Sequence, residues 1–206
     1  MSILNTADEA AIQQRIGEIE QKTAGELLVV TAPRSSGYDR ARAQASALVT
    51  FALAVLTYLF VPHIPGVWVL CGQAPLFVGL YWLAALPPIT RALVAEGVQR
   101  QKVAARARQL FVEQGITETR DRSGVLVYLS EVEHRIEILA DRGVHQRVGA
   151  EGWQRMVDGV VSAIQRGQAG QGVLAAIDAI GLVLTEHFPR RADDVNELSD
   201  TVVRVT

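Results

Sequence analysis

Three carboxylates are the residues of this sequence whose placement could bind a metal ion. Glu26 opens one predicted strand, Asp121 precedes a second, and Asp141 ends a third. Parallel pairing of the first two strands and antiparallel pairing of the third would bring all three carboxylates to one end of a sheet. Carboxylate oxygens are the ligands that Ca²⁺ and Mg²⁺ prefer. The pattern therefore predicts a divalent-cation site for Ca²⁺ or Mg²⁺ formed by Glu26, Asp121 and Asp141.

The same carboxylates have a second interpretation as ordinary surface groups. Arg120, Arg122 and Arg142 are the sequence neighbours of Asp121 and Asp141. They would satisfy these two carboxylates as exposed ion pairs, which contribute little to stability. Asp is also a common turn residue at strand ends. The sequence alone leaves both interpretations open.

The signatures of well-known catalytic sites are missing from the sequence. There is no Cys-x5-Arg loop, Asp-x-Asp pair, P-loop, Gly-x-Ser-x-Gly or His-Glu-x-x-His. The histidines show no metal-ligand spacing, and we expect them at the surface, with His134 in a strand link and His145 in a loop. No catalytic residue is identified, and no bound organic cofactor is expected.

Charge is distributed unevenly along the chain. The 206 residues include 20 Lys and Arg and 22 Asp and Glu, a net charge of −2, yet none of these charged residues lies between positions 43 and 90. A near-neutral chain argues against a nucleic-acid-binding protein, which needs an excess of Lys and Arg to neutralise phosphates. The single cysteine, Cys71, excludes an internal disulfide, and no zinc-binding pattern is present.

The uncharged segment has the length and pattern of two membrane spans. Residues 45–61 and 67–86 are apolar and are separated by a turn at residues 62–66. A bilayer core needs about 20 helical residues. The segment therefore predicts a transmembrane helical hairpin in contact with the lipid bilayer. A buried core hairpin is the alternative, but a domain of this size rarely covers two helices that are apolar on every face.

The flanks of the hairpin predict its orientation. Basic residues lie on both sides of it, whereas the turn carries only His63; the basic residues are Arg34, Arg40, Arg42, Arg91, Arg100, Lys102, Arg106 and Arg108. The positive-inside rule then places both termini and the folded domain in the cytoplasm. The N-terminal residues indicate an amphipathic helix and no cleavable signal peptide.

The remaining sequence predicts an αβα sandwich over a small mixed sheet. Periodicity indicates a helix over residues 7–24, a strand over 26–31, one long helix over 89–114 and strands over 123–130 and 135–141. Two amphipathic helices follow, with a short strand over 201–206. We expect residues 1–42 and 91–189 to form one α/β domain that the hairpin at 43–90 interrupts. The acidic tail at 190–206, with Asp193, Asp194, Glu197 and Asp200, is expected to be solvated.

Several motifs resemble the TPM domain family. They are Thr23-x-Gly25-Glu26, Ser123-Gly-Val-Leu-Val-Tyr-Leu-Ser130, Arg135-Ile-Glu-Ile-Leu-Ala-Asp-Arg-Gly143, Trp153, His187-Phe-Pro189 and Asn196-Glu-Leu. The chain looks most similar to a bacterial subgroup with a membrane hairpin after the first strand, which implies a location in the bacterial inner membrane. The common family layout, with the domain outside the cytoplasm behind a signal peptide, differs from the layout predicted here.

Two functions are considered. The predicted membrane hairpin and the missing catalytic set favour a non-catalytic interaction or auxiliary module for membrane proteins or envelope maintenance, with a membrane-protein partner; the resemblance likewise implies auxiliary roles toward membrane protein complexes. The alternative is weak divalent-cation-dependent phosphatase activity, which the resemblance implies for some members and which the three carboxylates could support.

Overall fold

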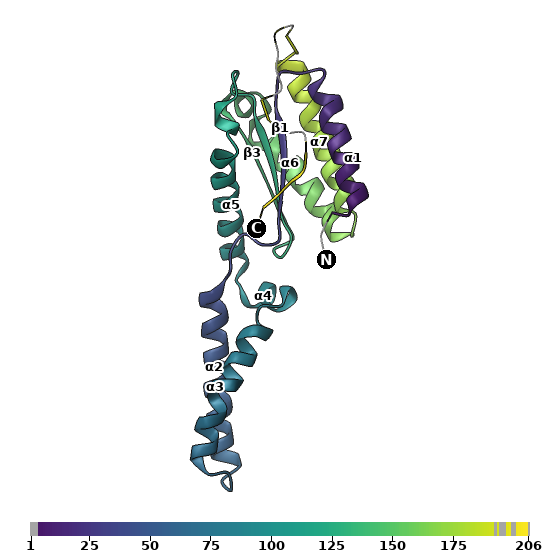
Figure 1. The fold of residues 1–206 in the computed structure, drawn as a ribbon. Coiled ribbons are helices and arrows are strands. Elements are labelled where there is room, and N and C mark those ends of the chain that lie inside the picture. The colour runs from purple at the N-terminus through teal and green to yellow at the C-terminus, as the bar shows by residue number, and fades with distance from the viewer. Residues whose placement is uncertain (1–3, 192, 194–196, 199–200, 206) are drawn as a thin grey trace. The chain divides into compact units, whose positions relative to one another are not determined.

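The chain folds into two compact units. The computed structural model describes residues 4–191, 193, 197–198 and 201–205 (Figure 1). Residues 1–35 and 100–206 form one unit, called here the sheet unit, and residues 36–99 form the other, the hairpin unit. Inside helix α6, the side chains at 148–152, 156 and 164–165 lie outside the description, so the predicted core positions Met156 and Ile164 do too.

The sheet unit contains a mixed sheet with the strand order β3-β2-β1-β4. Strand β1 (Leu27–Ala32) runs parallel to β2 (Val125–Ser130), which runs antiparallel to β3 (Arg135–Ala140). These pairings confirm the sequence prediction, because a long connection joins β1 to β2 and a short one joins β2 to β3. The short strand β4 (Val203–Arg204) pairs in parallel with β1 and confirms the predicted final strand.

Helices cover both faces of this sheet, which confirms the predicted αβα layering (Figure 1). Helices α1 (Thr6–Glu20), α6 (Arg142–Gln165) and α7 (Ala169–His187) lie on one face, where Leu27, Val29 and Val127 join their core. Helix α5 (Glu96–Glu113) and the 3-10 helix η1 (Ile116–Glu118) pack on the other, against Leu28 and Val30. Successive side chains alternate between the two cores because a strand has a period of two residues.

The first helix begins at Thr6, one residue before the predicted start at residue 7. Its N-cap is Asn5: the Asn5 Oδ1 accepts the Asp8 N–H at 2.8 Å, and Asp8 Oδ2 accepts the Asn5 N–H at 3.2 Å. This reciprocal pair is a capping box, which satisfies two backbone N–H groups at the start of the helix.

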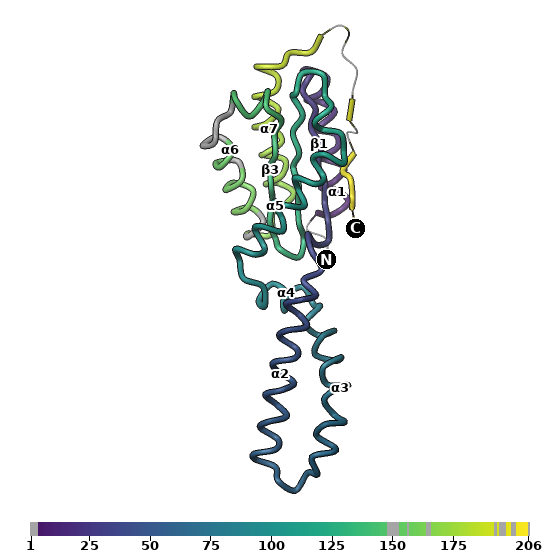
Figure 2. The backbone as a smooth tube through the Cα atoms, turned by 90° about the vertical axis from the view of Figure 1, so that its left-hand side faces the viewer, coloured from purple at the N-terminus to yellow at the C-terminus, as the bar shows by residue number. Residues whose placement is uncertain are grey.

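The hairpin unit contains two long helices joined by a short turn. Helices α2 (Asp39–Phe60) and α3 (Gly66–Leu83) run side by side (Figure 2). At the start of α2, the Arg42 guanidinium bonds Asp39 Oδ1 at 3.1 Å and lies 4.2 Å from the centre of the Tyr81 ring. The Tyr81 hydroxyl donates to the same Asp39 oxygen at 3.0 Å. This cluster joins the first turn of α2 to the last turn of α3.

The long helix predicted over residues 89–114 is two helices in the structure. Helix α4 (Pro87–Leu93) is followed by Val94, whose backbone is extended, and α5 starts at Glu96. The buried Gln99 amide donates to the carbonyls of Arg91 at 3.0 Å and Val94 at 2.7 Å. A side-chain amide thus bonds carbonyls that continued helical hydrogen bonding would otherwise engage. Hydrophobic periodicity cannot detect this break.

Two further predictions are corrected at the end of the chain. Helix α6 begins at Arg142, so His145 lies in its first turns and not in a loop. The described part of the tail is not simply solvated: Leu198, Val203 and Val205 pack against the core under α5, and Arg204 bonds Glu9 at 2.6 Å. Asp194 and Asp200 of the predicted acidic tail lie outside the described residues.

Candidate functional site

The three predicted metal ligands lie near one end of the sheet. Leu27 is opposite Val125, and Val125 is opposite Ala140, so the register brings Glu26 and Asp141 to the same edge. The Val125 N–H donates to the Glu26 carbonyl at 2.8 Å, and the Asp141 N–H donates to the Gly124 carbonyl at 2.9 Å. Asp121 is in the loop that precedes β2. We call this end the amino edge of the sheet, because β1 and β2 both begin there.

Glu26 binds the C-terminal segment of the chain. Its side chain is buried, and its two oxygens accept the backbone N–H groups of Glu197 at 3.0 Å and Leu198 at 3.3 Å. Charge-assisted bonds of this kind are among the stronger hydrogen bonds in proteins. The carboxylate therefore holds the segment that leads into β4.

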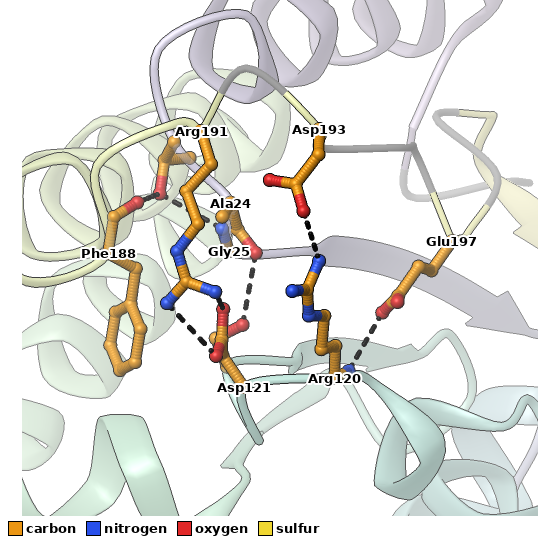
Figure 3. A network of polar contacts seen from close by, with 10 residues as sticks. Ala24, Gly25, Arg120, Asp121, Phe188, Arg191, Asp193 and Glu197 are labelled. Atoms are coloured by element: carbon orange, nitrogen blue, oxygen red, sulfur yellow. Dashed lines mark hydrogen bonds and ion pairs between the residues drawn. The ribbon is translucent and has the colours of Figure 1, made fainter.

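Asp121 forms an ion pair with Arg191, which follows α7. The two Arg191 terminal nitrogens each lie 3.2 Å from one Asp121 oxygen (Figure 3). The neighbouring Arg120 donates to Asp193 at 3.0 Å, and its backbone N–H donates to Glu197 at 3.0 Å. The Arg120 guanidinium lowers the pKa of Asp193. The sequence offered Arg120 and Arg122 as ion-pair partners of Asp121. In the structure its partner is instead Arg191, which is distant in sequence.

Asp141 is placed at the start of α6. Its Oδ1 accepts the Arg142 backbone N–H at 2.7 Å, and its Oδ2 lies 3.7 Å from Arg122 Nη1. Here the expected Arg122 pair is present, whereas Arg142 contributes its backbone and not its guanidinium. In the part of the chain that the structure describes, no group of three or more His, Cys, Asp or Glu side chains is arranged to hold a metal ion. Cation binding by Glu26, Asp121 and Asp141 stays a prediction.

A cavity of about 340 Å³ lies beside Asp121 at this edge, and sequence reasoning did not find it. Its lining comes from the segment before β1, the loop before β2, the first turns of α6, the end of α7 and the residues after α7; these are Ala24, Asp121, Arg147, His187, Phe188, Pro189, Arg190 and Arg191. The Arg147 guanidinium lies 4.6 Å from the centre of the Phe188 ring, and its Nη1 donates to the Gly143 carbonyl at 2.7 Å. The closely spaced basic residues His187, Arg190 and Arg191 could have indicated a basic site in the sequence. The fourth basic residue of the lining, Arg147, is distant in sequence and could not have been assigned to it.

The opposite end of the sheet contains a buried polar network that sequence reasoning also missed. Ser35 Oγ lies 2.9 Å from the Tyr128 hydroxyl and donates to Ser130 Oγ at 2.8 Å, and Ser130 in turn donates to the Glu133 carboxylate. Glu133 also accepts the Ser35 backbone N–H at 3.0 Å. Burial raises the pKa of Tyr128. The network fixes Ser35 at the point where the chain leaves the sheet unit.

The predicted exposure of the histidines is confirmed: His63, His134, His145 and His187 are all at the surface. Cys71 is also exposed, on α3. Neither residue type forms a catalytic pair among the described contacts.

Comparison with known proteins supports the fold. Residues 90–183 match the model of the TPM domain. That segment contains β2, β3, the helices α5, η1 and α6 and most of α7, but not β1 or the C-terminal segment. The expected resemblance to this family is therefore supported for the middle of the chain.

A solved structure has a similar fold over almost the whole chain. It is the NMR structure of the BA42 protein from the psychrophilic bacterium Bizionia argentinensis, with a TM-score of 0.61 and 19% sequence identity over 99% of this chain and 97% of that one. At this identity the likeness concerns the fold. No curated protein matches the sequence.

Proposed function

We propose that this protein is a membrane-anchored module: the hairpin unit spans a lipid bilayer, and the sheet unit is a non-catalytic surface for interaction with membrane proteins. The observation that carries the proposal is the surface of α2 and α3. Their most apolar 18-residue windows are only 11% and 0% buried by the rest of the chain. An isolated hairpin in water would expose far more apolar surface than soluble monomers tolerate.

The lengths of the two helices fit a bilayer. At 1.5 Å per residue, the 22 residues of α2 and the 18 residues of α3 extend about 33 Å and about 27 Å. The hydrocarbon core is about 30 Å thick. Large apolar side chains point outward, including Phe60 and Trp68, which are 77% and 69% exposed. In hydrocarbon this surface would be stable, because lipid replaces the missing protein contacts.

The orientation follows from charge. Arg34, Arg40 and Arg91 flank the helices on the side of the termini, and the turn carries only His63. The proposed topology therefore puts both termini in the cytoplasm of a bacterial cell, with the hairpin in the inner membrane. Arg42 contributes less positive charge to this end of the hairpin than its position suggests, because its side chain is buried and paired with Asp39 beside Tyr81.

Tryptophan fluorescence can test the anchor, since the three tryptophans divide between the units. Trp68 and Trp82 are exposed on α3, whereas Trp153 is buried in the sheet unit. The test uses the full chain, reconstituted in vesicles with brominated lipids, as two variants: W153F, and W68F/W82F. We expect strong quenching in W153F and little in the W68F/W82F control. Equal weak quenching in both variants would contradict the anchor.

The role of the sheet unit needs a partner. Photo-crosslinking from exposed positions of this unit in native membranes should capture a recurrent membrane protein. A crosslinker at Leu182, on the exposed face of α7, reports contacts of the sheet unit, and a matched one at the hairpin turn reports contacts of the hairpin unit on the other side of the bilayer. Absence of any recurrent protein from both positions would argue against the interaction role while leaving the anchor intact.

A further inference from the structure

We propose that the cavity at the amino edge of the sheet binds a small soluble oxyanion ligand, one that carries a phosphate or carboxylate group. The proposal does not depend on the membrane anchor. It rests on the charge of the cavity lining, on the way two of its arginines are held, and on its size.

Basic side chains outnumber acidic ones among the described residues that line the cavity. Arg147, Arg190 and Arg191 contribute three guanidinium groups, and Asp121 contributes one carboxylate. His187 adds a further nitrogen ligand or donor. Guanidinium groups are always charged and bind carboxylate and phosphate oxygens with two parallel hydrogen bonds. The guanidinium groups attract an anion that enters the cavity, whereas they repel a divalent cation.

Arg147 is held in place before any ligand arrives. Its guanidinium stacks on Phe188, whose ring is buried and whose carbonyl accepts the Ala24 N–H at 2.8 Å and the Thr23 hydroxyl at 2.6 Å. One of its nitrogens donates to Gly143. A guanidinium has five N–H donors, so this bond and the stacking leave other donors at the cavity. A fixed side chain loses less entropy on binding, which raises affinity.

Arg191 is oriented by Asp121, the one acidic residue among the described residues that line the cavity. Both of its terminal nitrogens contact Asp121, so the carboxylate fixes the plane of the guanidinium at the cavity wall (Figure 3). Asp121 also offsets part of the positive charge. Asp121 is then a residue that positions Arg191 and not a metal ligand. Replacing Asp121 by a neutral residue should raise the net positive charge of the cavity.

The cavity has the size of a small-molecule site. Its volume of about 340 Å³ lies at the lower end of the range typical of ligand pockets. Such a space suits a compact anion better than a polymer. The ligand class is therefore a small molecule with one phosphate or carboxylate group.

The test is a titration of the full chain in nanodiscs of zwitterionic lipid, with inorganic phosphate in one arm and acetate in the other, at constant ionic strength. We expect millimolar or tighter binding in at least one arm, and the stronger arm identifies the group. Arg147→Gln should weaken that binding about tenfold, because a charge-assisted bond is lost. Arg204→Gln is the matched control: Arg204 is an exposed arginine on β4, is paired with Glu9, and is not among the cavity residues. It should leave binding unchanged.

Asp121→Asn distinguishes an anion site from the cation site predicted from the sequence. An anion site should bind phosphate or acetate at least as tightly in this variant, since the repulsion by the carboxylate is lost and this offsets the lost orientation of Arg191. A cation site would instead lose Ca²⁺ or Mg²⁺ affinity. If the Arg147→Gln protein does not fold, Arg190→Gln replaces it and should likewise weaken binding of the anion. Binding of neither anion below about 20 mM, or equal loss in the Arg204→Gln control, would overturn the proposal.

Discussion

Helices α3 and α7 have nearly the same length and similar mean hydropathy, yet the structure uses them in opposite ways. Both are long and apolar enough to cross a membrane, as is α2. Half of the apolar window of α7 is buried inside the sheet unit, against α1 and α6, whereas none of the window of α3 is buried. Length and composition therefore do not separate a core helix from a membrane candidate.

The distribution of polar residues does separate them. Helix α7 carries Asp178, Glu186 and His187 at exposed or half-exposed positions, and its buried residues follow a helical stripe that includes Val173, Ile177, Ile180 and Leu184. Helix α3 has no charged residue and no such stripe. An amphipathic helix needs one covered face, and a helix that is apolar all round needs an apolar surrounding on every side.

The largest expected difference between the two helices concerns truncation of a side chain. Ile177→Ala on α7 should destabilise the sheet unit by about 2–5 kcal/mol, because Ile177 is fully buried and a cavity would remain. Leu70→Ala on α3 should change this free energy by less than about 0.5 kcal/mol, because Leu70 is exposed. Urea unfolding in mild detergent, followed by Trp153 fluorescence in a W68F/W82F background, measures both. A similar loss of unfolding free energy in the two variants would contradict the view that α7 is a covered core helix and α3 is not.

A charge placed on each helix should affect membrane insertion differently. Leu76→Arg near the centre of α3 should cost about 2.5–3.5 kcal/mol of insertion free energy, because the bilayer centre disfavours Arg. Leu182→Arg on α7 should be tolerated, because Leu182 is 74% exposed on the sheet unit. Alkaline extraction of membranes reports the bound fraction of each variant. Release of the Leu182→Arg protein alone would reverse the assignment of the two helices.

The packing of glycines should distinguish the helices on a smaller scale. A Cβ added at Gly181 on α7 would lie 2.6 Å from Ile19 Cδ1 and 2.8 Å from Ile19 Cγ1, whereas one added at Gly79 on α3 would meet nothing within 4 Å. We expect Gly181→Ala to lower the free energy of unfolding by about 1–3 kcal/mol through overpacking. Gly79→Ala should be neutral in the same urea assay. A neutral Gly181→Ala would mean that α1 moves easily away from α7.

The smallest expected effect is a pH dependence that comes from one carboxyl group of the sheet unit. Burial raises the pKa of Glu137 on β3. The unfolded chain then loses this proton first as pH rises, so the stability that Glu137 contributes is present at acidic pH and falls toward neutral pH. Glu137→Gln should remove this fall and stabilise the protein at pH 7. Thermal unfolding between about pH 4 and pH 7 tests it; parallel curves for both proteins would contradict it.

The sequence predicted those parts of the fold that depend on local spacing. Ile12, Ile16 and Ile19 recur at helical intervals and are buried on α1. The apolar run before Ser130 forms a strand buried on both faces, as a central strand requires. The candidate site was predicted less well: the chain does bring Glu26 and Asp141 to one edge, but the partners of Glu26 and Asp121 lie far away in sequence, in the segment after α7.

By itself, the sequence determined the alternation of helices and strands, the parallel and antiparallel pairing, and the uncharged segment of 48 residues. Hydrophobic periodicity indicates the helices and strands, and the length of the connection between two strands indicates whether they pair parallel or antiparallel, so these features follow from residue spacing along the chain. Only the tertiary structure decided that α7 is covered and α3 is not, and that Arg147, Arg190 and Arg191 surround one cavity. The reason is that burial and charge clustering depend on contacts between segments distant along the chain, and no local pattern records which segments will meet.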